Sequence, residues 1–159
     1  MATKKLGATA SAVAAIAMAV GLAKPMEGYR GYVYRDPIGV LTYCYGETEN
    51  AKAMQGKKFS ETECAALLTK RMAHYAQGNE KCVPGYNSLP TPVQAAFDDF
   101  SYNVGNGAFC KSTAAKLLSA GKLREACGEF KKWIFAGGRP LPGLVHRRNL
   151  EEAMCLKGV

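Results

Sequence analysis

Two carboxylic acids and a hydroxyl lie close together in the first third of the chain, at Glu27, Asp36 and Thr42. Hydrolysis of a glycosidic bond requires two carboxyl groups in opposed environments, one that donates a proton to the leaving oxygen and one that stays ionised. Glu27 follows an apolar stretch and is the better candidate for the proton donor, because apolar surroundings disfavour its charged form. Asp36 lies on a polar turn and is the candidate for the ionised partner, and the Thr42 hydroxyl could orient the attacking water.

Residue chemistry alone does not make these three residues a site. A surface glutamate and an aspartate before a proline are common in proteins without catalysis, so a purely structural role stays open at this point. The elements around the three residues decide whether a cleft can bring them together.

The flanking residues predict one small β lobe followed by many helices. Residues 28–46 are rich in Tyr, Val and Gly, which is typical of a short twisted hairpin or a three-stranded sheet. Ser60-Glu61-Thr62-Glu63 is a capping box that opens a helix to about residue 77, and Thr91-Pro92 supplies an N-cap and a first-turn proline. Further helices are expected over 112–120, 122–134 and about 144–156, with an irregular connection over 78–90 and Trp133 in the core. The expected fold class is α+β, mainly helical.

An uncharged segment of eighteen residues, Leu6 to Ala23, precedes Glu27. As a helix it would extend about 27 Å, close to the thickness of a bilayer core. It contains eight alanines and only six large apolar residues, so membrane insertion should be marginal. The segment is compatible with a cleaved signal peptide, an ordinary anchor, a temporary anchor that later joins the soluble domain, or a core helix of a cytosolic protein. We favour the temporary anchor, and expect residues 1–25 to form it and residues 26–159 to form the catalytic domain.

The chain is basic, with 21 Lys and Arg against 13 Asp and Glu and a formal charge of +8. This charge is compatible with an anionic partner such as a bacterial cell wall or a membrane surface, and equally with simple solubility. Aromatic and basic residues are not interleaved as on a nucleic-acid stacking platform, so we expect no nucleic-acid partner.

Six cysteines are spread along the chain, with no Cys-x-x-Cys pair and only two histidines, so we expect no metal site and no cofactor. An even number of cysteines behind an export signal indicates an oxidising compartment, although buried thiols in a cytosolic protein are the alternative. Sequence does not choose among the fifteen possible connectivities. Our hypothesis pairs neighbours along the chain: Cys44 with Cys64, Cys82 with Cys110, and Cys127 with Cys155.

The pattern Glu27, eight residues, Asp36, five residues, Thr42 resembles the catalytic signature of the phage-type lysozymes, the group that contains the T-even phage lysozyme. Other stretches match in the same order, and the resemblance runs from about residue 26 to the C-terminus. These stretches are Phe100 to Gly105, Ala108-Phe109, Ser112-Thr113, Trp133, Ala136 to Gly138, and Gly143 to Arg148. The resemblance implies a lysozyme-like fold with a small β lobe and a helical lobe, here behind an N-terminal hydrophobic helix.

With its weakly hydrophobic N-terminal segment, the chain is most similar to the signal-arrest-release (SAR) endolysins of lambdoid phages. In that family the exported enzyme waits, tethered and inactive, in the host inner membrane facing the periplasm, and becomes active in the soluble periplasm when the membrane is depolarised. The resemblance implies hydrolysis of the β-1,4 bond between N-acetylmuramic acid and N-acetylglucosamine in peptidoglycan, and lysis of the host cell.

The resemblance also implies roles for individual residues. Glu27 would be the general acid, Asp36 the base or electrostatic partner, and Thr42 the water-positioning hydroxyl of an inverting hydrolysis. The partners would be peptidoglycan and, transiently, the inner membrane through residues 6–23, and we expect a monomer.

Four more residues match positions of the family. Tyr102, Asn103 and Ser112 match positions that line the glycan cleft, and Arg148 matches a basic position of the C-terminal motif. Packing or surface support is an equally good explanation for each of them.

The chain departs from the family pattern Thr-x-Gly-x-Gly-His-Thr at two positions, since it reads Thr42-Tyr-Cys44-Tyr-Gly46-Glu47-Thr48. Glu47 replaces the histidine and adds a third carboxylate near the proposed site. Cys44 replaces a glycine, and we favour a structural disulfide there over a regulatory thiol. The N-terminal segment has no cysteine, so we do not expect release by disulfide exchange within it.

Two other functions stay open. A lytic transglycosylase of similar fold needs the acid but no partner that activates water, and the pair Asp36 and Thr42 argues against it. A secreted cationic protein that binds walls or membranes without catalysis would need none of the three residues.

Overall fold

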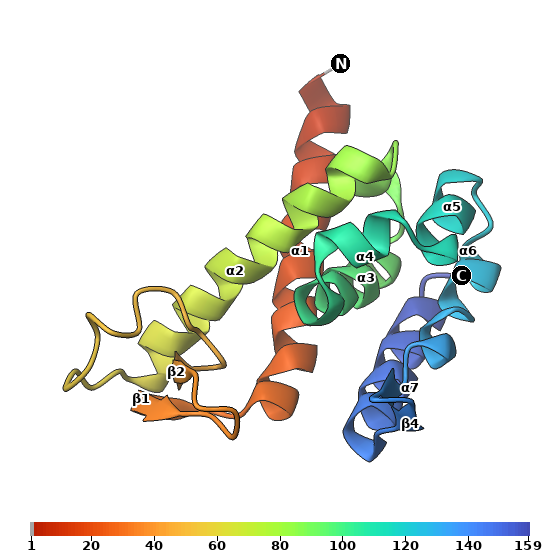
Figure 1. Cartoon of the computed structure of the whole chain (residues 1–159). Coiled ribbons are helices and arrows are strands. Elements are labelled where there is room, and N and C mark those ends of the chain that lie inside the picture. The colour runs from red at the N-terminus through yellow and green to blue at the C-terminus, as the bar shows by residue number, and fades with distance from the viewer. Residues whose placement is uncertain (1) are drawn as a thin grey trace.

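The computed structural model describes residues 2–159, with side chains from residue 10 onward. It is mainly helical, with two short antiparallel sheets. Figure 1 shows the β1–β2 hairpin on one side of the molecule, α5 and α6 on the other, and α1 between them. In chain order the elements are α1 (Ala2–Glu27), β1 (Arg30–Arg35), β2 (Leu41–Cys44), α2 (Glu61–Cys82), the 3-10 turn η1 (Tyr86–Ser88), α3 (Thr91–Val104), α4 (Asn106–Cys110), α5 (Thr113–Ser119), α6 (Leu123–Cys127), the 3-10 turn η2 (Phe130–Lys132), β3 (Phe135–Ala136), β4 (Arg139–Pro140) and α7 (Pro142–Leu156).

Helix α1 carries the uncharged N-terminal segment without a break as far as Glu27. Alanine is the best helix former, and Gly28 ends the helix in the left-handed conformation, with φ of 73°. Ala15, Ala19 and Ala23 recur every four residues and are completely buried, because this face of α1 packs along α3 and α2. In this structure the apolar segment is part of the folded body, and α1 runs through the boundary that we expected after residue 25.

A polar contact fixes the N-terminal half of α1 to the start of α3. The hydroxyl oxygens of Ser11 and Thr91 lie 2.7 Å apart, and the Gln94 side-chain amide donates to the Ser11 hydroxyl at 3.3 Å. Gln94 is buried and also donates to the Leu89 carbonyl at 2.7 Å. We expected Thr91 to be the N-cap of α3; instead Pro90 occupies that position, and the Thr91 hydroxyl is engaged by Ser11.

Two hydrophobic cores give the molecule two lobes. The core of the small lobe joins the hairpin to α1 and α2 through residues that include Val20, Ala23, Tyr43, Tyr45, Leu68 and Met72. The core of the helical lobe is built on aromatic rings: Phe97 stacks on Phe130 with centroids 4.6 Å apart, and Trp133 lies edge-on to Phe100 at 5.2 Å. The predicted β lobe followed by a helical lobe is confirmed, and so is the place of Trp133 against the core.

Two predicted segments differ from the structure. The helix expected over 122–134 is split into α6 and η2, because a disulfide ties Cys127 to α7 and Phe130 turns into the aromatic core. The connection expected over 78–90 is helical as far as Cys82 and contains η1. The extra helical turn of α2 is stabilised by buried hydrogen bonds of Asn79, which donates to the Tyr86 hydroxyl at 3.1 Å and accepts from the Ser101 hydroxyl at 2.7 Å.

Three disulfides join Cys44 to Cys64, Cys82 to Cys110, and Cys127 to Cys155, which are the pairs that we expected. The first ties the hairpin to α2, the second ties α2 to α4, and the third ties α6 to α7. Cys44 is therefore part of a disulfide, the alternative that we favoured over a regulatory thiol.

Candidate active site

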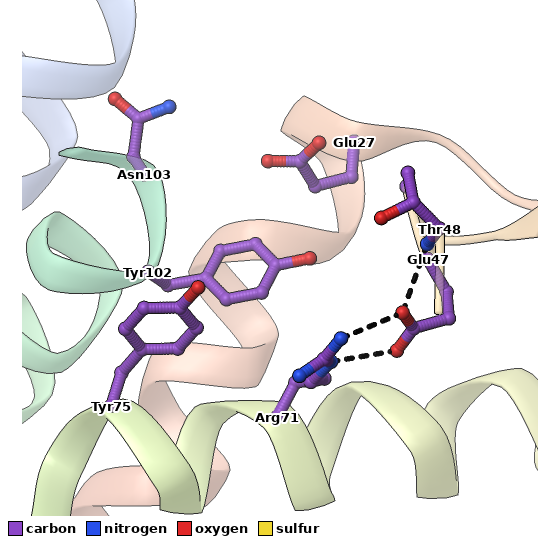
Figure 2. Close-up of a pocket in the computed structure, with 8 residues that line it drawn as sticks. Glu27, Glu47, Thr48, Arg71, Tyr75, Tyr102 and Asn103 are labelled. Carbon is purple, nitrogen blue, oxygen red and sulfur yellow. Dashed lines mark hydrogen bonds and ion pairs between the residues drawn. The ribbon is translucent and has the colours of Figure 1, made fainter. Parts of the chain in front are cut away.

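A cavity of about 290 Å³ lies where the end of α1, the segment after β2, and helices α2 and α3 meet. Its lining combines carboxylates, a guanidinium group and tyrosine rings: Glu27, Gly46, Glu47, Thr48, Arg71, Tyr75, Tyr102 and Asn103. Figure 2 shows Glu27 and Tyr102 facing this space from different elements, and Arg71 reaching from α2 to Glu47. The cavity therefore brings Glu27 together with Tyr102 and Asn103, two of the residues that we expected in a glycan cleft.

Glu27 ends α1 at the edge of this cavity, and its side chain is 25% exposed. One carboxylate oxygen, Oε1, accepts a hydrogen bond from Nη1 of Arg147 at 2.8 Å. The other, Oε2, faces the backbone of Gly46, where an added Cβ would lie 3.1 Å from the oxygen. Gly46 also adopts φ of 80°, a conformation that favours glycine, and a side chain there would press against the Glu27 carboxylate.

Arg147 is fixed from behind by Asp99 of α3. Its Nε donates to Oδ2 of Asp99 at 3.1 Å and its Nη2 donates to Oδ1 at 2.7 Å, and both side chains are buried. Burial alone would lower the pKa of Arg147, but the contacts with Asp99 and Glu27 raise it above the ordinary value. Arg147 is thus a permanent cation, oriented by two contacts so that Nη1 points at the Glu27 carboxylate.

Glu47, the third carboxylate near the site, is paired with Arg71 of α2. Arg71 donates through Nε to Oε2 at 2.9 Å and through Nη2 to Oε1 at 3.0 Å. Glu47 also accepts the backbone N–H groups of Thr48 and Glu49. Burial raises the pKa of Glu47, but Arg71 and these amides outweigh burial and leave the pKa below its ordinary value. Glu47 therefore does not add an unpaired charge beside Glu27.

Asp36 and Thr42 lie on the β1–β2 hairpin and are not among the described residues that line the cavity. Oδ1 of Asp36 accepts the N–H groups of Ile38 at 3.0 Å and Val40 at 2.8 Å, and these two hydrogen bonds orient the carboxylate. Thr42 is buried, and its hydroxyl donates to the Val40 carbonyl at 3.0 Å. Because its proton is engaged there, the Thr42 hydroxyl is left to act as an acceptor for a water molecule.

Ser112 and Arg148 have other partners in the structure. Ser112 is the N-cap of α5, accepts the Ala115 N–H at 3.1 Å, and lines a separate cavity of about 570 Å³ beside Trp133. Arg148 is only 1% exposed and donates to the Trp133 carbonyl and to the side chains of Asn103 and Glu151. The basic side chain of the C-terminal motif that reaches Glu27 is therefore its neighbour, Arg147.

Sequence reasoning missed Arg147, Asp99 and Arg71. The exchange of a family histidine for Glu47 was a signal that a cation should lie nearby, and Arg71 is that cation. No sequence pattern pairs Arg147 with Asp99, which is 48 positions away. Among the described side chains, no group of three His, Cys, Asp or Glu residues is placed to hold a metal ion.

Comparison with known proteins places this geometry in a family. Residues 24–151 match the family model for phage lysozyme. The chain is 38% identical over 133 residues to a SAR-endolysin of Bacteriophage PS119, covering 84% of this chain and 78% of the relative.

Among solved structures, the active form of P1 phage endolysin Lyz shares the fold with a TM-score of 0.77 and 23% identity, over 89% of this chain and 84% of that one. The secreted inactive form of the same endolysin matches with a TM-score of only 0.51 and 20% identity, over 69% and 76% of the two chains. The fold described above is therefore nearer to that of the active form. From the extent of the family match and the identity to its relatives, this chain belongs to the phage lysozyme family.

Proposed function

We propose that the protein is a muramidase that hydrolyses the β-1,4 bond between N-acetylmuramic acid and N-acetylglucosamine in peptidoglycan and so lyses the host cell. The observation that carries this proposal is the position of Glu27, a partly exposed carboxyl group at the edge of a cavity between the two lobes, with one cationic partner. A glycan in this cavity would present a glycosidic oxygen to Glu27. The formal charge of +8 suits an anionic wall polymer.

We propose an inverting reaction in which Glu27, at the end of α1, acts together with Asp36 and Thr42 of the β1–β2 hairpin. Glu27, when protonated, gives its proton to the leaving oxygen as the glycosidic bond breaks. Asp36 takes a proton from a water molecule that donates its other hydrogen to Thr42, and the water oxygen forms the new bond to the anomeric carbon. The contacts of the hairpin support these roles, because Asp36 uses Oδ1 for backbone amides and Thr42 offers only an acceptor.

Digestion of purified peptidoglycan tests the proposal. We expect muropeptides that end in reducing N-acetylmuramic acid, with the α anomer formed first, and no product from the variant E27Q. E125Q, which alters an exposed carboxylate of α6 outside the cavity lining, is the matched control and should digest normally. An anhydro-sugar product would identify a transglycosylase instead, and lysis by E27Q would indicate a wall-binding or membrane-active protein without catalysis.

We also propose that residues 1–25 hold the exported protein in the host inner membrane, inactive, before it enters the soluble periplasm. The stretch Ala10–Glu27 is long and apolar enough to cross a membrane, with a mean hydropathy of 1.3, and the same helix ends at the proposed acid. While it spans a bilayer, α1 cannot pack Ala15, Ala19 and Ala23 against α3. The membrane-held form would therefore lack the present surroundings of Glu27.

Proteoliposomes test whether the membrane-held form is inactive. The enzyme should cleave added peptidoglycan poorly while it is tethered and efficiently after release, and N-terminal sequencing of the released form should find the segment retained. Equal cleavage by the tethered and released forms would show that tethering does not inactivate the enzyme, and would leave the proposed reaction unaffected.

A further inference from the structure

Glu151 of α7 is completely buried, beside the guanidinium groups of Arg147 and Arg148 and near the Asp99 carboxylate that Arg147 also contacts. Its Oε2 accepts a hydrogen bond from Arg148. Its Oε1 lies 3.7 Å from Nε of Arg147, which is too far for a hydrogen bond, and has no hydrogen-bond partner in the described part of the chain. Leaving a buried carboxylate oxygen unpaired is costly, so this oxygen needs a partner.

Asp99 can be that partner if a proton lies between the two carboxyl groups. Both groups face the same nitrogen, since Nε of Arg147 lies 3.1 Å from Oδ2 of Asp99 and 3.7 Å from Oε1 of Glu151. Two ionised carboxylates only repel, whereas a protonated carboxyl group donates to an ionised one. Both oxygens of Asp99 already accept from Arg147. The proton therefore belongs on Oε1 of Glu151, the oxygen that has no other partner.

The charges around Glu151 agree with this assignment. The charged groups around Glu151 are Asp99 from α3 and Arg147 and Arg148 from its own helix. Two more groups lie one contact further away: Glu27 of α1 is bound to Arg147, and the Trp133 carbonyl at the end of η2 accepts from Arg148. If Glu151 were ionised, three carboxylates would share two guanidinium groups. If Glu151 is neutral, two carboxylates are balanced by two guanidinium groups. Burial, and then the neighbouring Asp99, raise the pKa of Glu151 well above its ordinary value, against the lowering effect of Arg148.

We propose that Glu151 is a positioning residue for the acid: it keeps a proton at neutral pH, donates it in a hydrogen bond to Asp99, and so fixes the carboxylate that orients Arg147 toward Glu27. With Asp99 held in place, its two contacts set the plane of the Arg147 guanidinium and leave Nη1 for Glu27. The inference rests on the proposed role of Glu27 and adds a residue that does not touch the substrate.

The first test measures stability and does not depend on catalysis. A group whose pKa is raised by folding stabilises the protein below its unfolded pKa of about 4.3, and this stabilisation is lost as the pH rises toward the folded pKa. E151Q keeps a neutral donor and an acceptor at every pH. We therefore expect E151Q to melt at a higher temperature than the wild type at pH 8 and at about the same temperature at pH 4.

The matched control is E152Q, which changes the next residue of α7, a carboxylate paired with Lys131 at 3.2 Å. It should show no such gain at pH 8. A loss of stability for E151Q at pH 8 that disappears in acid would mean that Glu151 is ionised, and a change independent of pH would mean that its proton plays no part. Either outcome overturns the proposal, whether or not the protein proves to be a muramidase.

The second test measures kcat and KM on soluble glycan chains. E151L cannot donate to Asp99, so Arg147 should be misaligned and kcat should fall, on the order of 10²-fold for a displacement near 1 Å, with KM unchanged. E151Q should restore kcat because it restores the donor. Equal kcat values for E151L and the wild type, or a loss in E151L that E151Q does not restore, would contradict a positioning role; inactivity of the wild type itself would instead refute the proposed function.

Discussion

Arg147 contacts Glu27 across 120 positions of sequence, with Nη1 2.8 Å from Oε1. The contact joins the end of α1 to α7, the last helix. Both helices must therefore be packed in the folded protein before the proposed acid has its cationic neighbour. It also places a permanent positive charge where Glu27 would become negative during the reaction.

We expect R147Q to lower kcat on the order of 10²-fold or more, because it removes a charge-assisted donor from the group that changes charge. It should also lower the free energy of unfolding by about 3–5 kcal/mol, because the buried Asp99 carboxylate would lose both of its hydrogen bonds from the guanidinium group. Steady-state kinetics and thermal melts measure the two effects. R124Q, at an exposed arginine of α6, is the control and should change neither.

The Glu47–Arg71 pair should stabilise the protein above pH 4. Since the pKa of Glu47 is lowered by folding, its contribution is present above the unfolded pKa of about 4.3 and is lost as the pH falls through the folded pKa. E47Q should therefore lower the melting temperature at pH 7 by about 2–4 °C, if the pair contributes about 1 kcal/mol, and the difference should shrink in acid. Melts of E47Q, R71Q and the double variant would give the coupling; if the single effects simply add, the pair does not stabilise the fold.

Ser11 should report on the docking of α1. S11L removes the hydrogen bonds to Thr91 and Gln94 and makes the segment more hydrophobic, so it should slow release from the membrane and also destabilise the released enzyme. A14L adds a leucine on the exposed face of the same helix and should slow release only. Membrane fractionation separates the first effect and thermal melts of the purified enzyme the second; equal melting temperatures for the two variants would mean that the Ser11 contact contributes nothing to docking.

The Cys44–Cys64 disulfide should be structural. Removing it in C44A/C64A opens a link between residues 20 positions apart and should cost about 3 kcal/mol of stability. Specific activity well below the melting temperature should be retained, because neither cysteine lines the cavity. An unstable but fully active variant would agree with this expectation, whereas a stable, inactive variant would point to a role for Cys44 at the site.

Sequence predicted what local patterns determine. The capping box at Ser60 opens α2 with both reciprocal hydrogen bonds formed, and Ser112 caps α5 as the helix expected from that position requires. The split of the helix over 122–134 was not predictable from periodicity, because it depends on where Phe130 and Cys127 find partners in the helical lobe. Tertiary packing outweighs local propensity at such positions.

The same distinction applies to the candidate site. Glu27 was identified by spacing within one short stretch, and Tyr102 and Asn103 by a motif within another. Packing of α3 against α7 brings Asp99 close to Arg147 and Glu151. The sequence does not show which of the adjacent residues Arg147 and Arg148 contacts Asp99.

The alanine stripe of α1 has a consequence for how lysis could be timed. Under the proposed control, the helix meets two environments in turn, lipid and the surface of α3, and only the face with Ala15, Ala19 and Ala23 must fit the second. The opposite face, where Val13 is 63% exposed, meets lipid in the first environment and solvent in the second. Substitutions on this exposed face would lengthen or shorten the time that the helix stays in the membrane, and would leave the face that packs on α3 unchanged. The time of lysis could therefore change in evolution without a change in the folded enzyme.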